Sequence, residues 1–351
     1  MNRSIKIANR LVSLNDPPFI IAEMSGNHNQ SLEKALKIVE AAAKAGAHAI
    51  KLQTYTADTM TIDANNASFF INNDNSLWNG QSLYNLYQKA HTPWEWHKQI
   101  FEYCRKLGLI GFSTPFDETA VDFLESLNVP AYKIASFENN HLPLIKKVAT
   151  TGKPLIISIG MATVAEMDET VRTAREAGCK EIVLMKCTST YPAAPEDINL
   201  LTLPHLKKLF DTEVGLSDHT LGIGVSIAGV VLGATVIEKH ITLSRIEGGV
   251  DSEFSIEPDE MKLLVDETLK AWQALGKVRY GPTEKEKAST IFRRSIYVVN
   301  DIKEDEKLTS KNIRIIRPGN GLPPKYFDML LGIKVSCHVK RGTPMSWELV
   351  K

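Results

Sequence analysis

The sequence has no excess of charge of either sign. Its 351 residues carry 41 Lys and Arg against 41 Asp and Glu, so the formal net charge at pH 7 is zero. General binding to nucleic acid or to anionic membranes depends on a strong electrostatic attraction, which this chain lacks. We therefore expect no nucleic-acid partner and no membrane partner, and we expect a few local cations to hold any anionic ligand.

Cysteines and long apolar runs are also scarce. The four cysteines, at positions 104, 179, 187 and 337, are far apart and form no CxxC pair. This spacing argues against a disulfide framework or a thiolate zinc site and fits a reducing cytoplasm. No stretch approaches the roughly 20 apolar residues that span a bilayer, and residues 1–18 contain no apolar core of signal-peptide length. We expect a cytoplasmic location.

Short apolar runs alternate with segments of helical periodicity over most of the chain. Continuous apolar strands that alternate with helices are typical of a parallel sheet covered by helices. Eight such units over about 260 residues favour a (β/α)8 TIM barrel. A doubly wound open sheet is the alternative, because the pattern alone does not prove closure. The predicted strands are 18–25, 48–53, 109–115, 131–136, 154–160, 181–188, 213–218 and 234–240, and the predicted helices include 31–47, 94–108, 118–128, 143–152, 164–178 and 222–233.

Changes in composition divide the chain. We assign residues 1–275 to the barrel domain with an N-terminal extension, 276–290 to a polar linker, and 291–351 to a small β-rich domain with many turns. Residues 54–92 are rich in Asn, Ser, Tyr and Trp and interrupt the strand–helix rhythm after the second strand. A long insertion at that place should cover the catalytic face of the barrel.

Polar side chains gather at the carboxyl ends of most predicted strands, where barrels of this kind keep their active sites. Buried polar groups cost free energy unless they are paired, so packing alone explains such a collection poorly. We interpret this rim as a functional site. Its members are Glu23, Ser25, Asn27, His28, Lys51, Gln53, Ser113, Thr114, Lys133, Ser136, Glu138, Asn139, Thr188, Ser189, Tyr191, Ser217, Asp218, His219, Glu238, Lys239 and His240.

Two histidines of the rim, His219 and His240, follow adjacent strands at equivalent places. Two imidazoles in that arrangement can share a divalent metal, with Mn, Co, Zn or Mg as the candidates for a site of histidine, carboxylate and water. The alternative is that each imidazole only satisfies nearby backbone groups.

Two lysines of the rim, Lys51 and Lys133, end inner strands close to a ring of hydroxyl groups. Charge combined with many donors is what a phosphate dianion needs, so we expect a phosphate site here. The alternative is a pair of structural salt bridges to Glu23 or Glu138. Glu23 itself is a candidate general acid or base beside the metal and the phosphate, or else a lysine counter-ion. The hydroxyl groups belong to Ser113, Thr114, Ser136, Ser189 and Ser217.

Six ordered segments resemble the sialic-acid synthase family, whose members condense phosphoenolpyruvate with an amino sugar to make nine-carbon acids. The resemblance covers nearly the whole chain, because RRSIYVVNDIKEDEKLTSKNIRIIRPGNG, near the C-terminus, resembles the antifreeze-like (SAF) domain of those enzymes. It implies a transferase made of a TIM barrel followed by a SAF domain. The six segments are IAEMSGNHNQSLEKALKIVEAAAKAGAHAIKLQTY, FSTPFD, YKIASFENN, KCTSTYP, GLSDHT and EKHIT.

Two segments indicate the sugar. Members that make N-acetylneuraminate or legionaminate carry a GPDH-type segment after the eighth strand, whereas this chain has EGGVDSEFSIEP at 247–258. That segment and SFENNHLPLI, after the fourth strand, resemble the members that make pseudaminic acid. The resemblance thus implies pseudaminic acid as the product, with N-acetylneuraminate and legionaminate as alternatives.

The resemblance also implies roles for individual residues. His219 and His240 would hold the metal, with Mn²⁺ favoured and Mg²⁺ or Co²⁺ possible, and Glu23 would be the acid or base. The RPGNG segment would bring Arg317 to the sugar in a neighbouring subunit, which implies a domain-swapped homodimer. Phosphoenolpyruvate would be held by Lys51, Lys133, Thr114, Ser136, Ser189 and Ser217. Gln53, Glu138 and Tyr191 would face the substrates, and Asp251 would contact the sugar.

Two other functions compete with this one. A Schiff-base aldolase would use Lys51, Lys133 or Lys239 as its nucleophile, because such enzymes place the lysine at a strand end. The histidine pair argues against it. A non-enzymatic carbohydrate- or ice-binding protein built around the C-terminal domain would leave the charged rim of the barrel without a use.

Overall fold

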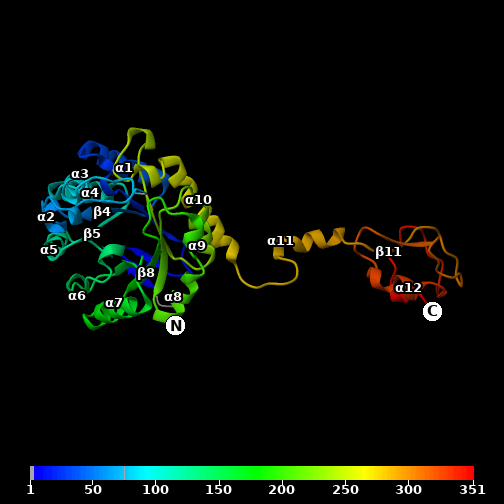
Figure 1. The fold of residues 1–351 in the computed structure, drawn as a ribbon. Helices are drawn as coiled ribbons and strands as arrows, with labels where there is room; N and C mark the ends of the chain where they lie inside the picture. Colours follow the sequence, from blue (N-terminus) through cyan, green and yellow to red (C-terminus); the bar gives the residue numbers. More distant parts are fainter. Residues whose placement is uncertain (1–3, 75) are drawn as a thin grey trace. The chain divides into compact units, whose positions relative to one another are not determined.

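In the computed structural model, which describes residues 4–74 and 76–351, eight parallel strands close into a barrel (Figure 1). The order around the barrel is β10, β3, β4, β5, β6, β7, β8 and β9, so the first and last strands pair and no edge is left open. The predicted TIM barrel is confirmed and the open sheet is excluded. The strands are β3 (Phe19–Glu23), β4 (Ala49–Thr54), β5 (Ile110–Pro115), β6 (Tyr132–Ile134), β7 (Leu155–Ser158), β8 (Ile182–Cys187), β9 (Glu213–Asp218) and β10 (Val236–His240).

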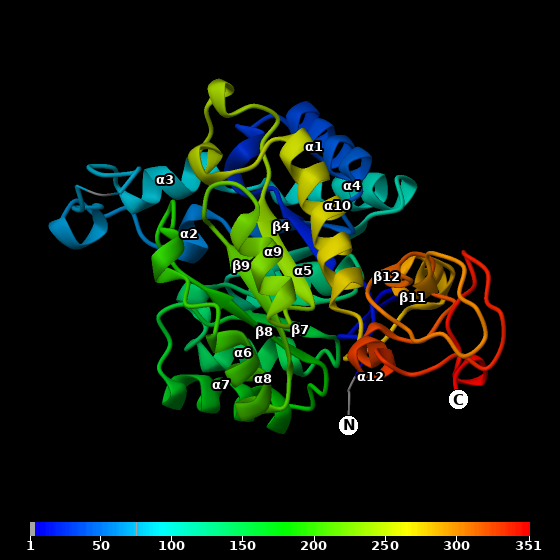
Figure 2. The same cartoon turned by 90° about the vertical axis from the view of Figure 1, so that its right-hand side faces the viewer.

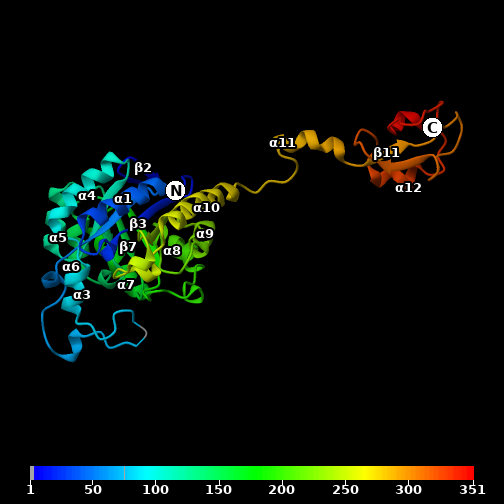
Figure 3. The ribbon, with the colours of Figure 1, turned by 90° about the horizontal axis from the view of Figure 1, so that it is seen from above.

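A helix follows each strand and packs on the outside of the barrel, as the view from above shows (Figure 3). The first of them begins where the Ser31 hydroxyl accepts a hydrogen bond from the Lys34 amide and ends at Gly46, whose φ of 84° suits glycine. The first and last helices of the ring lie side by side (Figure 2). The helices are α1 (Leu32–Ala45), α4 (Trp94–Lys106), α5 (Glu118–Ser126), α6 (Leu142–Ala149), α7 (Val164–Glu176), α8 (Thr202–Phe210), α9 (Gly224–Val231) and α10 (Pro258–Leu275).

Shorter elements complete the chain. An antiparallel pair precedes the barrel, two helices lie in the insertion after β4, and the rest belong to the C-terminal part or to single turns. They are β1 (Ile5–Ile7), β2 (Arg10–Val12), α2 (Ala57–Met60), α3 (Leu83–Ala90), α11 (Glu284–Lys287), β11 (Ser295–Val298), β12 (Ile313–Ile316), α12 (Phe327–Leu330), and the 3-10 turns η1 (Ser25–His28), η2 (Ala67–Phe69), η3 (Ser136–Glu138), η4 (Pro195–Asp197), η5 (Arg245–Glu247), η6 (Ser252–Phe254), η7 (Ala288–Phe292), η8 (Pro324–Tyr326) and η9 (Trp347–Leu349).

The hairpin of β1 and β2 covers the amino end of the barrel. The backbone amide of Lys6 donates to Oε1 of Glu181, which directly precedes β8, over 3.0 Å. The guanidinium of Arg10 lies 6.0 Å from the ring centre of Phe19, the first residue of β3. Ile7 is fully buried and belongs to the same apolar core as the barrel strands. The barrel is therefore closed at this end and accessible from the other.

The insertion after β4 extends beyond the ring of helices, and both Figures 2 and 3 show it as the segment that carries α3. It also turns back to the barrel. The Trp78 indole Nε1 donates to the Val250 carbonyl oxygen over 3.0 Å, and its ring lies 5.9 Å from that of Tyr191. Val250 and Tyr191 follow β10 and β8, so the insertion contacts the carboxyl-end face, as predicted.

A second compact unit begins at Lys277 and extends to Lys351. It contains the antiparallel pair β11–β12 and an apolar core of its own, which includes Ile296, Ile313 and Val335. The segment that we expected to be a linker, 276–290, contains α11, because the Thr283 hydroxyl and the Glu286 carboxylate cap each other's backbone amides. Among the described residues, no helix combines the length and the apolar character that a bilayer crossing requires.

Candidate active site

Four ionisable side chains meet inside the barrel just below its open mouth. Glu23 on β3, Lys51 on β4, Lys133 on β6 and Glu238 on β10 are each at most 4% exposed. The Lys51 Nζ lies 2.7 Å from Glu23 Oε2 and 3.6 Å from Glu238 Oε1, and the Lys133 Nζ lies 3.9 Å from the same Glu238 oxygen. We call these four residues the ionic cluster. They come together because alternate residues of a barrel strand face its interior.

Hydroxyl groups surround the ionic cluster. The Lys51 ammonium donates to Thr114 Oγ1 over 3.1 Å, and the Lys133 ammonium donates to Ser158 Oγ over 2.5 Å. The Ser217 hydroxyl donates to Glu238 Oε1 over 3.2 Å. Ser158, at the end of β7, was not among the predicted site residues, although its position at a strand end is the same signal that identified the others.

The two carboxyl groups of the cluster differ in how strongly they hold a proton. Burial raises the pKa of Glu23, and the nearby Glu238 carboxylate adds to the rise against the opposing effect of Lys51. For Glu238, burial acts in the same direction, but Lys133 and Lys51 outweigh it and lower the pKa. Glu238 is thus the anion between two cations, while Glu23 is the group on which a proton is more easily held.

The imidazoles of His219 and His240 lie above the cluster with their ring centres 5.3 Å apart. Phe254 packs against both rings, at 4.8 Å from His240 and 6.0 Å from His219. The His240 Nδ1 is buried without a hydrogen-bond partner, and burial together with the neighbouring His219 lowers the pKa of His240 well below its ordinary value. A neutral, unpartnered ring nitrogen is the form of histidine that binds a metal.

These residues fit a metal that takes only two ligands from the protein. In residues 4–74 and 76–351, no group of three or more His, Cys, Asp and Glu side chains is arranged to hold an ion. The nearest carboxylate to the unpartnered nitrogen is that of Asp251, whose Oδ2 lies 3.8 Å from His240 Nδ1. Water and substrate oxygens would have to supply the remaining ligands.

A chain of polar contacts links the cluster to the histidines along one wall of the mouth. The Gln53 amide donates to Glu23 Oε1 over 3.0 Å and to Ser25 Oγ over 3.1 Å. The Ser25 hydroxyl in turn donates to Asp251, which lies beside His240. Residues that are more than 220 positions apart in the sequence therefore form one continuous surface.

Four other predicted residues lie on the opposite wall. Glu138, in η3, has a buried Oε2 without a hydrogen-bond partner, and burial raises the pKa of Glu138 to about 7. The hydroxyls of Ser136 and Ser189 both face Gly160, where a Cβ would lie 2.7 and 2.4 Å from them. Tyr191 stacks obliquely on His219, with 4.7 Å between the ring centres.

Three residues of the predicted rim do not reach the mouth. The Ser113 hydroxyl bonds to Thr54 Oγ1, which also contacts His97 of α4, so Ser113 faces the helices and not the barrel interior. Lys239 and Asp218 form an ion pair of 2.9 Å with both side chains fully buried. We correct the prediction for these three residues. Because Asp218 and the Thr220 carbonyl hold the Lys239 ammonium away from the mouth, Lys239 is also removed as a candidate Schiff-base nucleophile.

Besides Ser158, three more residues near the mouth were not predicted from the sequence. Trp78 and Phe254 are aromatic residues of long loops, and no periodicity marks them. Cys187 ends β8, and its Sγ lies 3.9 Å from the His219 Nδ1. Burial would raise the pKa of this thiol, but His219 and the neighbouring donors lower it to about 7. Arg317 follows β12 in the second unit and is exposed.

Comparison with known proteins identifies the family. The NeuB family matches residues 38–280 and the SAF domain matches residues 293–351. The chain is 45% identical to a pseudaminic acid synthase of Campylobacter jejuni over 92% of this chain and 94% of the other, and 44% identical to one of Helicobacter pylori over 94% and 97%. It is 36% identical to an N,N'-diacetyllegionaminic acid synthase of C. jejuni over 89% and 94%.

The fold comparison agrees with this result. A crystal structure of N-acetylneuraminic acid synthetase from Leptospira borgpetersenii, determined with citrate, superposes with a TM-score of 0.73 at 31% identity and covers 82% of this chain and 95% of that one. A sequence match across both units and a structural match over 82% of this chain lead to the same assignment. The chain belongs to the NeuB family.

Proposed function

We propose that this protein condenses phosphoenolpyruvate with 2,4-diacetamido-2,4,6-trideoxy-L-altrose to give pseudaminic acid and inorganic phosphate. The observation that carries the proposal is the ionic cluster below the histidine pair, in a chain of the NeuB family. The sugar is chosen on similarity: identity is 45% and 44% to two pseudaminic acid synthases and 36% to a legionaminic acid synthase. Synthesis of legionaminate or N-acetylneuraminate by the same chemistry is the less favoured alternative.

Phosphoenolpyruvate would bind to the lysines of the ionic cluster. Lys51 and Lys133 supply the charge, and hydroxyl groups supply further donors to the phosphate and carboxylate oxygens. Burial of both lysines strengthens their attraction for an anion, because little water screens them. The hydroxyl groups in this role belong to Thr114, Ser136, Ser189 and Ser217.

His219 and His240 would hold a divalent metal, with Mn²⁺ proposed first and Mg²⁺ or Co²⁺ able to replace it. The neutral, unpartnered Nδ1 of His240 supports this role. When bound, such an ion supplies Lewis-acid polarisation of the sugar aldehyde. We propose that Gln53, Glu138, Tyr191 and Asp251 bind the open-chain sugar and orient its aldehyde.

The protein's own groups would then manage charge and protons. The methylene carbon of phosphoenolpyruvate attacks the aldehyde carbon, and the positive charge that develops at the enol carbon is stabilised by the Glu238 carboxylate. Water adds to that carbon, and phosphate leaves with its bridging oxygen. Glu23, whose pKa is raised, gives a proton to the aldehyde oxygen or takes one from the water. The lysines act by charge and form no imine.

Two further parts of the proposal concern the whole protein. We propose a homodimer in which Arg317 of one copy reaches the sugar in the barrel of the other. We also propose a cytoplasmic location, which the free thiols of the four cysteines support.

Turnover in water enriched in ¹⁸O tests the bond that breaks. Cleavage between carbon and oxygen leaves the released phosphate unlabelled, because water attacks carbon and not phosphorus. Mass spectrometry of the phosphate gives the result, with the two sugars of the alternative products assayed in parallel. Labelled phosphate, or faster phosphate release with either alternative sugar, would contradict the proposal.

A further inference from the structure

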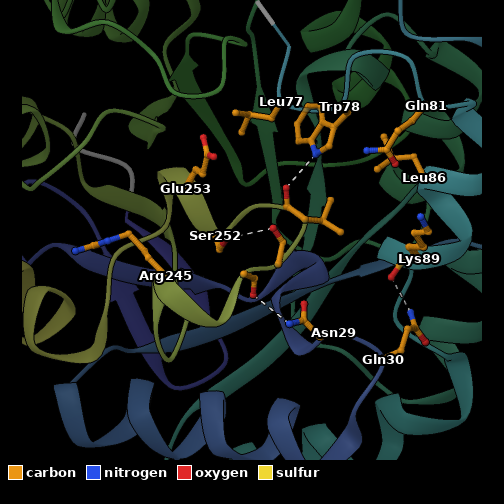
Figure 4. A pocket seen from close by; sticks show the side chains of 13 residues that line it. Asn29, Gln30, Leu77, Trp78, Gln81, Leu86, Lys89, Arg245, Ser252 and Glu253 are labelled. Carbon is orange, nitrogen blue, oxygen red and sulfur yellow. Dashed lines mark hydrogen bonds between the residues drawn. The ribbon is translucent and has the colours of Figure 1, made fainter.

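Beside the mouth of the barrel lies a pocket of about 620 Å³ to which none of the roles above assigns a ligand (Figure 4). Three segments that are distant in the sequence line it. Asn29 and Gln30 follow η1, Trp78 and Gln81 belong to the insertion after β4, and Val250 belongs to the loop after β10. All three segments begin at carboxyl ends of strands, so the pocket opens on the same face as the active site.

Trp78 lines the pocket and joins it to the loop that carries Asp251. Its indole Nε1 donates to the Val250 carbonyl oxygen, which fixes the insertion to the loop after β10 (Figure 4). Its ring lies 5.9 Å from Tyr191, which stacks on His219. Val250 directly precedes Asp251, whose carboxylate lies 3.8 Å from His240. The pocket thus lies next to the residues that surround the histidine pair.

The lining of the pocket combines amide groups with apolar surface. The Gln81 side-chain amide makes no hydrogen bond to any described residue, and it faces the pocket together with Asn29 and Gln30 (Figure 4). Leu86 and Val250 add apolar surface. An acetamido group carries an amide donor, an amide acceptor and a methyl group, and these three features match such a lining.

Charge in the pocket favours an uncharged ligand. Lys89 and Glu253 line opposite sides and offset each other (Figure 4). The third charged residue, Arg245, is already paired with Glu260, and its Nε lies 3.9 Å from Glu257. A phosphate or carboxylate would therefore find little net attraction here, unlike at the ionic cluster.

We infer that this pocket is the subsite for the 4-acetamido end of the sugar, and that Trp78 and Gln81 determine specificity for it. The inference rests on the proposed function. With the aldehyde carbon at the histidines, the 2-acetamido group on the next carbon must stay beside them. C4 is three bonds away from the aldehyde carbon along the open chain. The acetamido group on C4 can pass Asp251 and enter the pocket. There Gln81 bonds to its amide, and Trp78 holds the Val250 side of the pocket in place.

The test compares two sugars that differ only at C4: 2,4-diacetamido-2,4,6-trideoxy-L-altrose and 2-acetamido-2,6-dideoxy-L-altrose, which carries a hydroxyl there. For Gln81→Ala and Trp78→Phe we expect the KM of the diacetamido sugar to rise about tenfold, the loss typical of a missing contact in a specificity pocket. For the sugar with a hydroxyl at C4, the KM should stay within about twofold of the wild-type value. The KM of phosphoenolpyruvate and kcat should also stay within about twofold.

Trp272→Phe is the matched control, because the Trp272 indole also donates to a backbone carbonyl, that of Leu14, but belongs to α10. It should leave both sugars unaffected. Equal losses on the two sugars in the Trp78 and Gln81 variants, or an unchanged preference, would overturn the subsite alone. Failure of the wild type to turn over the diacetamido sugar would overturn the proposed function, and the subsite with it.

Discussion

The two histidines of the site lie side by side but differ in how readily they accept a proton. Burial and the neighbouring His219 depress the pKa of His240. Burial acts on His219 in the same direction, yet the Cys187 thiol beside it outweighs this effect and raises the pKa of His219. The unpartnered His240 nitrogen is therefore in the form that binds a metal, whereas any proton on His219 must leave before this ring can act as the second ligand.

Replacing either histidine should abolish turnover without unfolding the protein. We expect His219→Ala and His240→Ala to reduce phosphate release by more than about a thousandfold, because in the described part of the chain no third His, Cys, Asp or Glu side chain is arranged to replace the lost ligand. Circular dichroism should remain that of the wild type. His205→Ala, on the exposed side of α8, is the matched control. Full activity of either active-site variant under stringent chelation would remove the metal from the proposal.

Glu138 should make stability depend on pH. Burial raises the pKa of Glu138 from 4.5 to about 7, so the unfolded chain loses this proton first as the pH rises. The folded state is therefore favoured below pH 4.5, and this advantage is lost between pH 4.5 and 7. Glu138→Gln removes the effect. The free energy of unfolding of the variant minus that of the wild type, measured with urea, should increase by about 3 kcal/mol between pH 4.5 and 8.

A carboxylate with the opposite shift provides the control for this measurement. The Thr163 backbone amide and hydroxyl at the start of α7 lower the pKa of Glu166. Glu166→Gln should accordingly lose stability relative to wild type as the pH rises, the reverse of Glu138→Gln. A flat difference for Glu138→Gln over the same range would contradict the assigned burial.

The sequence identified most of the residues that line the mouth, and the reason is periodicity. Residues at the carboxyl end of a barrel strand are close together whatever their separation along the chain. The errors share one cause: a one-residue step turns a side chain from the interior to the helices. Ser113 next to Thr114, and Lys239 next to Glu238 and His240, are polar neighbours of this kind, and the pattern could not decide which of them faces inward.

At the scale of elements, the buried pair of Lys239 and Asp218 joins β10 and β9 to the start of the following helix. The Asp218 carboxylate also accepts hydrogen bonds from the hydroxyls of Thr220 and Ser226, the latter in α9. The Lys239 ammonium donates to the Thr220 carbonyl oxygen over 2.6 Å. These contacts tie together the two strands that carry the histidines.

Removing one partner of this pair should therefore be costly. We expect Lys239→Met to lower the free energy of unfolding by about 3–5 kcal/mol, because an uncompensated carboxylate stays buried. Adding Asp218→Leu should restore part of the loss. In the control, Lys262→Met breaks the exposed pair with Asp266 on α10 and should cost less than about 1 kcal/mol. Denaturant unfolding measures all three, and equal costs for Lys239→Met and Lys262→Met would contradict the role.

Continuous apolar strands were predictable as elements, whereas several helices were not. The eight predicted strands all occur, because burial on both faces leaves an uninterrupted apolar run. The helix α10 was not predicted, although its start carries two signals. Pro258 lies in its first turn, and Glu257 and Glu260 cap each other's backbone amides. The preceding loop is long and irregular, and its one aromatic residue, Phe254, packs against Tyr191, His219 and His240, which are distant in the sequence or lie outside the loop.

At the scale of the whole molecule, the proposed exchange of Arg317 between subunits predicts complementation. His219→Ala lacks a working barrel and Arg317→Ala lacks the arginine, so each homodimer should be inactive. In a mixed dimer, the barrel of the Arg317→Ala chain would receive the arginine of the other chain. Random pairing after co-expression should then restore roughly a quarter of wild-type phosphate release, since half of the dimers have one intact site.

The same mixture distinguishes exchange from action within one chain. If Arg317 served its own barrel, each chain of the mixed dimer would carry one defect and no intact site would form. Size-exclusion chromatography with light scattering should show a dimer for both variants. Activity no higher than that of the separate variants, from a sample shown to contain mixed dimers, would contradict the exchange.

The hairpin closes the amino end of the barrel, so ligands must enter and leave the interior through the carboxyl end. Both lysines lie beside Glu238, which precedes His240 by two residues on the same strand. The phosphate position is therefore deeper in the barrel than the sugar position. Because both substrates would use the same opening, the deeper one must bind first and its product must leave last. We expect phosphoenolpyruvate to enter before the sugar, the nine-carbon acid to depart first, and inorganic phosphate to be the last species to leave.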